Sequence, residues 1–206
     1  MTQCLLAIFS LRAARPLALL LCCFLAPHMV GAQEPAGKWS SALLSGGGRA
    51  LTYQAVDGPG GFEIGFFCDT TYTPSERGAL GFNLRVNGAS KLKNFSFVDF
   101  EGPDAPAQAK KLLTARVVRK DGPPLVLPMR ASGSFVDTDA FAFSVAEVTR
   151  VASSEPKTLL KALAAGDAES LQITVTDFRN PKSTLVFTIP VATRRQDFNV
   201  LLTGVK

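Results

Sequence analysis

The amino-acid sequence predicts a mainly β protein, an antiparallel β-sandwich or barrel-like domain with one short helix near residues 155–165. Many short segments alternate apolar and polar residues, the pattern of strands buried on one face. Clusters of Gly, Pro, Asn and Asp separate these segments and indicate turns. One stretch alone, around Leu159 to Leu163, spaces its leucines as a helix does.

The clearest strand of the first half is residues 80–86, where four apolar residues alternate with Gly81, Asn83 and Arg85. Residues 62–68 alternate in the same way. Cys68 falls on their apolar face, which favours a buried cysteine over an intermolecular disulfide. The Asn87-Gly88 pair is a strong hairpin signal, so residues 91–100 are expected to return as the partner strand.

Further strands are expected in the second half of the chain. Alternation places them at 112–119, 125–129, 141–145, 171–176 and 185–189. Turn residues separate them at Asp121-Gly122-Pro123-Pro124, Asp137-Thr138-Asp139 and Asn180-Pro181. Residues 197–202 fit either a short helix or a strand.

The expected helix has recognisable ends. Ser153 and Ser154 are candidate N-caps, and Pro156 suits the first helical turn. Gly166 suits the position just after the last turn, where a left-handed backbone is common.

The first 32 residues have the features of a cleavable secretory signal. Arg12 and Arg15 precede an apolar run over residues 17–26, and Val30-Gly31-Ala32 offers small residues for cleavage after Ala32. The run is too short to span a bilayer, which takes roughly 20 apolar residues. The sequence therefore predicts one exported domain over residues 33–206, periplasmic or secreted, without a transmembrane segment.

Removing this signal limits the chemistry of the mature domain. His28 is the only histidine of the chain, and three of the four cysteines also lie in the signal. A domain without imidazole cannot form a Ser-His-Asp or Cys-His site and lacks the usual ligands of zinc and copper. We therefore expect no cofactor, no metal centre and no enzymatic activity, while carboxylate or Ser-Lys chemistry and oxygen-ligated calcium stay open.

Five acidic residues are the candidate site residues that remain. They form two groups, Asp99, Glu101 and Asp104 after one segment and Asp137 and Asp139 within a turn. Either group could ligate calcium or supply an acid–base pair for hydrolysis, although neither has the spacing of a calcium-binding loop. Solvated turn residues are the alternative interpretation.

The basic residues do not indicate nucleic-acid binding. They occur as scattered pairs at Lys91/Lys93, Lys110/Lys111, Arg119/Lys120 and Arg194/Arg195. Nucleic-acid binding would need them on one face with exposed aromatic residues. A weak attraction to anionic envelope surfaces is the property they do suggest.

Three segments near the C-terminus resemble the tail of invasion-associated locus B proteins. They are a short helix ending in glycine at 159–166, a strand ending in Asp177 at 171–177, and an apolar strand at 185–191. The chain lacks that family's paired cysteines and has Arg194 to Phe198 where a Gly-Phe is expected. The resemblance implies a bacterial periplasmic protein linked to the cell envelope, and it implies no catalytic residues.

Three functional hypotheses follow. The first is an exported, non-enzymatic β-sandwich that binds a protein or an envelope component. The second is a carboxylate-dependent hydrolase or carbohydrate-binding domain that uses Asp99, Glu101, Asp137 or Asp139. The third is an inhibitor or immunity-type protein that makes contact through the loop at Asp57–Gly61.

Overall fold

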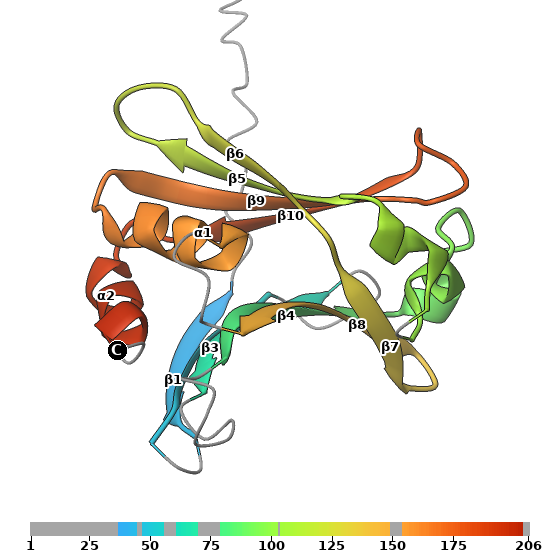
Figure 1. Cartoon of the computed structure of the whole chain (residues 1–206), viewed down its shortest axis with the longest axis horizontal. Coiled ribbons are helices and arrows are strands. Elements are labelled where there is room, and N and C mark those ends of the chain that lie inside the picture. Colours follow the sequence, from blue (N-terminus) through green and yellow to red (C-terminus); the bar gives the residue numbers. More distant parts are fainter. Residues whose placement is uncertain are drawn as a thin grey trace, which may run out of the picture. The chain divides into compact units, whose positions relative to one another are not determined.

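Two antiparallel sheets face one another in the computed structural model (Figure 1), which describes residues 37–44, 47–55, 61–69, 79–102, 104–148 and 154–203. The predicted mainly β, sandwich-like fold is thereby confirmed, and neither sheet closes into a barrel within the described strands. The predicted signal over residues 1–32 and residues 57–60 of the Asp57–Gly61 loop lie outside the described residues.

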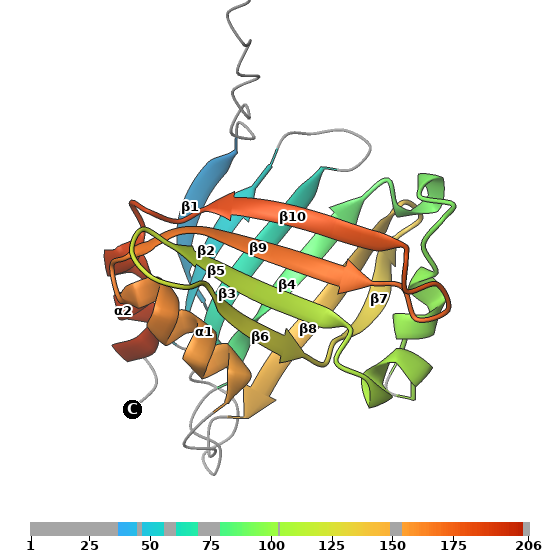
Figure 2. The same cartoon turned by 90° about the horizontal axis from the view of Figure 1, so that it is seen from above.

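The larger sheet has six strands in the order β1-β2-β3-β4-β8-β7, and the smaller has four in the order β10-β9-β5-β6. The six strands are β1 (Lys38–Leu43), β2 (Arg49–Gln54), β3 (Phe62–Asp69), β4 (Ala79–Asn87), β7 (Ser132–Asp137) and β8 (Ala140–Val148). The four are β5 (Leu113–Arg119), β6 (Leu125–Met129), β9 (Ala168–Thr176) and β10 (Thr184–Pro190). Figure 2 shows the smaller sheet running across the larger one.

The chain visits the two sheets alternately. β1 to β4 form a continuous antiparallel meander, β5 and β6 belong to the smaller sheet, and β7 and β8 return to the larger one beside β4. Arg130 and Ala131 alone separate β6 from β7, so one bent segment passes from sheet to sheet, as at the corners of other β-sandwiches. β9 and β10 then complete the smaller sheet beside β5.

The alternating apolar residues of the strands build the core between the sheets, as their period of two predicts. In β3 and β4 the residues at alternate positions are buried, and Cys68 among them is 1% exposed. Its predicted place in the core is therefore confirmed. Aromatic residues supply much of this core, and Tyr53, Phe66, Phe82, Phe141 and Phe143 are among the largest fully buried side chains.

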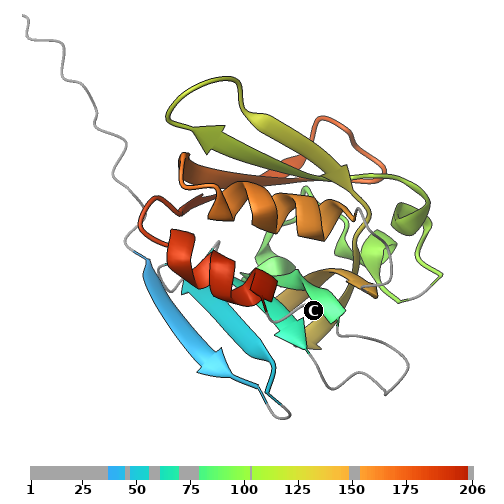
Figure 3. The same cartoon turned by 60° about the vertical axis from the view of Figure 1, so that its left-hand side comes forward.

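Two α-helices occupy one end of the sandwich, in the space between the sheets (Figure 3). The predicted helix is α1 (Glu155–Ala164), whose N-cap Ser154 accepts a hydrogen bond from the Lys157 N–H at 3.2 Å. Residues 197–202, for which the sequence fitted either a helix or a strand, belong to a second helix, α2 (Arg195–Thr203). No helix of the described ranges is long and apolar enough to cross a bilayer.

The prediction of a partner strand at residues 91–100 is wrong. The Gly88 backbone is left-handed (φ 70°) and turns the chain after β4, but β8 takes the place beside β4 that the partner strand would need. The segment instead forms two short 3₁₀ helices, η1 (Ala89–Lys91) and η2 (Phe97–Phe100), followed by η3 (Pro106–Ala109). Apolar residues would lie on both faces of a strand at this segment. Its sequence therefore lacks the alternation of apolar and polar residues that marks a half-buried strand.

β1 and β2 were not predicted from the sequence, although β2 does alternate the buried Leu51 and Tyr53 with Thr52 and Gln54. β1 is an edge strand with exposed side chains apart from the half-buried Trp39, so it has no alternation to detect. Trp39 fixes it in place, because its indole Nε1–H donates to the Pro190 carbonyl at 3.1 Å and its ring meets Phe198 edge-on at 6.1 Å.

A cluster of phenylalanine rings closes the end of the sandwich opposite the helices. Phe95, Phe97 and Phe100, from the segment around η2, pack against Phe141 and Phe143 of β8. The ring centroids of Phe100 and Phe143 lie 5.1 Å apart in an edge-to-face arrangement. All five side chains are at most 7% exposed, so the segment is held to the sheet by ring packing rather than by strand pairing.

Replacing Phe143 by alanine tests this packing. Phe143 is fully buried and contacts four other rings, so Phe143→Ala should lower the free energy of unfolding by about 3–5 kcal/mol. Urea unfolding followed by circular dichroism measures the change. The control Val186→Ala, at a side chain that is 54% exposed, should cost less than about 1 kcal/mol, and equal losses in both variants would contradict the proposed core.

Candidate anion-binding groove

Two loops meet at the phenylalanine end of the sandwich. One is the segment after β4, residues 88–96, and the other is the turn between β9 and β10, residues 177–183, drawn side by side in Figures 1 and 2. The Ser183 hydroxyl donates to the Asn94 carbonyl at 2.5 Å, and the Ser96 N–H donates to the Asp177 carboxylate, also at 2.5 Å. These bonds join segments that are more than 80 residues apart in the chain.

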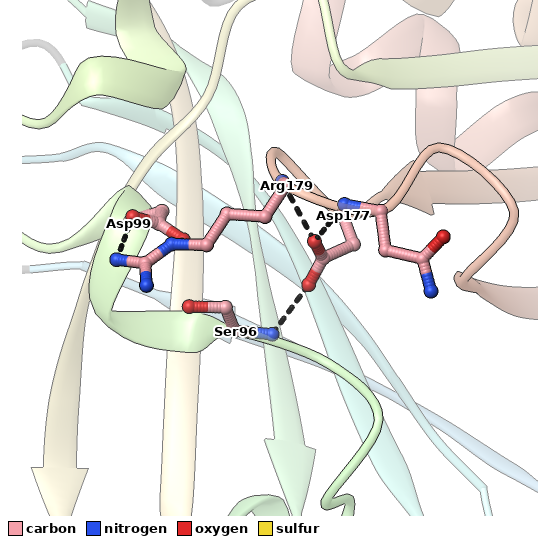
Figure 4. Close-up of polar contacts among 5 residues, drawn as sticks. Ser96, Asp99, Asp177 and Arg179 are labelled. Carbon is pink, nitrogen blue, oxygen red and sulfur yellow. Dashed lines mark hydrogen bonds and ion pairs between the residues drawn. The ribbon is translucent and has the colours of Figure 1, made fainter.

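Asp177 holds both loops at once. Its Oδ1 accepts the N–H groups of Arg179 (2.8 Å) and Asn180 (2.7 Å), which is the turn-forming role of an aspartate at the end of a strand. Its Oδ2 accepts the Ser96 N–H of the other loop (Figure 4). The side chain is buried, and three backbone donors satisfy its charge without a cationic side chain.

A second carboxylate, Asp99, anchors the Arg179 side chain above the same junction (Figure 4). The guanidinium donates from Nη2 to Asp99 Oδ1 at 2.9 Å, and its Nε lies 2.8 Å from Oδ2. The hydrogen bond from Arg179 lowers the pKa of Asp99 in spite of the burial of the carboxyl, and Asp99 in turn raises the pKa of Arg179. The carboxylate is 5% exposed and the arginine side chain 70%, so the pair is charged, with its cation facing solvent.

An open groove of about 760 Å³ lies between the two loops. Its lining contains three lysines, Lys91, Lys93 and Lys182, and no carboxylate. Neutral polar residues complete the polar part of the lining: Asn94, Asn180, Ser183 and Thr184. The groove is therefore cationic, and it is rich in groups that donate hydrogen bonds.

The three lysines differ in their partners. The Lys91 ammonium lies 3.7 Å from the Asp139 carboxylate at the rim. Lys93 and Lys182 are exposed and have no ion pair with any residue that the structure describes. Two unneutralised cations therefore face the groove, while the nearby charges of Asp99 and Asp177 are already engaged by Arg179 and by backbone N–H groups.

The five candidate acids do not form a common site. Asp99 is bound by Arg179, Asp137 forms an ion pair with Arg85 at 2.7 Å, and Asp139 accepts a short hydrogen bond from Ser90. Glu101 and Asp104 are exposed. No group of three His, Cys, Asp or Glu side chains suited to a metal ion occurs among the described residues.

The pKa shifts of Asp99 and Asp139 do not suit the proton donor of an acid–base pair. Such a pair needs one carboxyl group whose pKa is raised, so that it holds a proton at neutral pH. The pKa of Asp99 is lowered chiefly by Arg179, and that of Asp139 is lowered chiefly by the Ser90 hydroxyl. Both carboxyls are therefore ionised acceptors rather than proton donors.

The sequence indicated one side of the groove, through the basic pair Lys91/Lys93, but not the other. It marked Asp177 only as the end of a strand and gave no functional prediction for Arg179, Lys182 or Ser183. A signal was present, because an aspartate that ends a strand just before Asn180-Pro181 commonly caps a turn. Nothing in the sequence paired that turn with residues 91–96, because the contact depends on how the two sheets stack.

Together, the fold and this groove define a two-sheet β protein with a cationic groove at one end. Comparisons with protein-family models, with curated proteins and with solved structures find no match. The function is therefore argued from the geometry of the chain itself.

The Asp99–Arg179 ion pair should give the protein a specific pH dependence. Since the pKa of Asp99 is lowered in the folded state, its contribution to stability is complete above the ordinary value of 3.8 and is lost as the pH falls through the lowered value. At pH 7, Asp99→Asn should lower the free energy of unfolding by about 1–2 kcal/mol. The difference from wild type should shrink below pH 3.8.

Urea unfolding at several pH values between neutrality and strong acid measures this difference. The matched control is Asp121→Asn, an exposed turn residue that forms no ion pair with the described residues. A difference between Asp99→Asn and wild type that stays constant down to the most acidic pH would contradict a charged, stabilising pair.

Proposed function

We propose that the protein is an exported, non-enzymatic β-sandwich that binds a phosphate-bearing component of the cell envelope in the basic groove. The observation that carries this proposal is the lining itself, which has three lysines, four neutral polar residues and three apolar residues but no carboxylate. A predicted secretory signal and a mature domain without histidine agree with it.

The chemistry of the groove suits oxyanions. Lysine ammonium groups are compact charges with three donors each, and the amides and hydroxyls beside them add neutral hydrogen bonds. Exposed lysines can approach several oxygens of one or more phosphate groups without prior desolvation. A polar, open groove also fits a head group or a stretch of polymer better than a small molecule that must be enclosed, since pockets of the latter kind are mostly apolar.

The rigid floor of the groove supports binding. Asp177 and Ser183 fix the two loops by hydrogen bonds, so the lysine-bearing segments are already placed before any ligand arrives. A preformed site loses less conformational entropy on binding than one that must order its loops. The likeness of residues 159–191 to invasion-associated locus B proteins is in keeping with an envelope role.

Binding to phosphate-bearing probes tests the groove. Vesicles of phosphatidylcholine with phosphatidylglycerol represent a lipid head group, and soluble polyphosphate represents a polymer. The protein should bind at least one of these at low salt, and less at high salt, because exposed charges are screened. Lys93→Gln/Lys182→Gln should weaken that binding about tenfold, the loss of two exposed charge contacts.

A matched pair separates the groove from net charge. Lys120→Gln/Lys161→Gln removes the same two charges from exposed positions outside the groove and should change binding less than about threefold. Equal losses in both double variants, or no binding of either probe by the wild type, would refute the groove as the site.

The export signal has a separate test. N-terminal sequencing of the protein recovered from its natural source should find a chain that begins at Gln33, since cleavage is expected after Ala32. A recovered chain that retains Met1 or His28 would show that the signal is not removed. It would contradict both the predicted export and the expectation that the working protein has no histidine.

A further inference from the structure

A second hollow, of about 580 Å³, lies on the outer face of the six-stranded sheet and shares no lining residue with the basic groove. β4, β7 and β8 provide its floor, and Gly102 and Gln108 provide one wall. Its polar lining consists of Asn83, Gln108, Ser132, Ser134 and Ser144. Every lining side chain is uncharged, in contrast to the lysines of the groove.

The hydrogen-bonding groups of this lining are largely free. Gln108 uses one amide N–H to bond the Gly102 carbonyl at 2.6 Å, which fixes the amide and leaves its oxygen free. The side chains of Asn83 and of the three serines form no hydrogen bond with any other described residue. The hollow therefore offers two amides and three hydroxyls, which both donate and accept.

One pair of charges beside the hollow is neutralised, while the exposed carboxylate of Glu101 lies at its rim, next to Gly102 and bridged to Gly133. Arg85 lies beside Ala142 in the register of β4 and β8, and its guanidinium binds the Asp137 carboxylate at 2.7 Å. An ionic ligand would meet no unpaired charge in the lining. A neutral ligand with many hydroxyl groups could form hydrogen bonds with the uncharged amides and hydroxyls of the lining.

Strand register extends the polar surface beyond the hollow. One level of the outer face carries only hydroxyl, amide or glycine residues across all six strands: Ser40, Thr52, Gly65, Asn83, Ser144 and Ser132. Neighbouring strands lie about 4.8 Å apart, close to the length of one ring in an extended β-1,4-linked sugar chain. In Figure 1 the edge strands β1 and β7 both slope away from the smaller sheet, which bows this face inward.

We propose that this hollow is a binding site for a neutral oligosaccharide, with further sugar rings lying along the polar row. Sugar hydroxyls donate and accept, as do the serines, and the two amides bind paired hydroxyls or an acetamido group. The inference goes beyond the basic groove and does not depend on it.

Titration with cellotetraose and with N-acetylchitotetraose, followed by amide chemical shifts in the NMR spectrum, tests the site. At least one probe should bind saturably and shift the amides of Asn83, Ser132 and Ser144. Asn83→Ala/Gln108→Ala should weaken the binding about tenfold, the loss of two neutral hydrogen bonds. Both side chains are at the surface, and an unchanged urea midpoint shows that the variant is folded.

Two controls make the outcome specific. Gln196→Ala/Asn199→Ala removes the same two amide types from exposed positions on α2 and should leave the affinity within about twofold of wild type. Lys93→Gln/Lys182→Gln and raised salt should also leave it unchanged, because neither ligand nor hollow is charged. Failure of both probes to bind, shifts confined to other surfaces, or equal losses in the two amide variants would overturn the proposal.

Discussion

The packing of Phe95, Phe97 and Phe100 against β8 is the interaction on which the rest of the structure depends. The segment from residue 88 to residue 109 has no strand, and its 3₁₀ turns supply few hydrogen bonds to the sheets. Burial of its rings holds it, at roughly 1.5–3 kcal/mol for each large apolar side chain, and hydrogen bonds to the β9–β10 turn and to the Gly133 carbonyl add to this attachment. This packing closes one end of the sandwich, while α1 and α2 fill the other.

Both proposed sites are built on the two ends of that segment. Residues 91–95 form one side of the basic groove, and Gly102 with Gln108 forms a wall of the neutral hollow. The two surfaces differ in charge, in part because three acids at this end are engaged internally, whereas Glu101 and Asp104 are exposed. Asp99 binds Arg179, Asp177 binds three backbone N–H groups, and Asp137 binds Arg85. What remains is a groove with unpaired lysines and a hollow without net charge.

The strands that the sequence predicted well are those whose two faces have different environments. β3 and β4 alternate cleanly because one face meets the core and the other meets solvent, and α1 carried recognisable caps in Ser154 and Gly166. β1 was not predicted because it is an edge strand whose side chains are mostly exposed, so its sequence does not alternate between apolar and polar residues. Residues 91–100 were misjudged because Asn87-Gly88 does turn the chain, yet the strand that then pairs with β4 is β8, some 50 residues later.

The sequence by itself determined the fold class, the core face of the strands it predicted and the limits of α1, since these follow from local period and local capping. It also determined that residues 33–206 contain no histidine, because composition alone settles this. Only the tertiary structure decided which loops form the groove and which residues share a level of the outer face. Those juxtapositions arise from strand order and register, which join residues far apart in the chain and leave no mark in any local pattern.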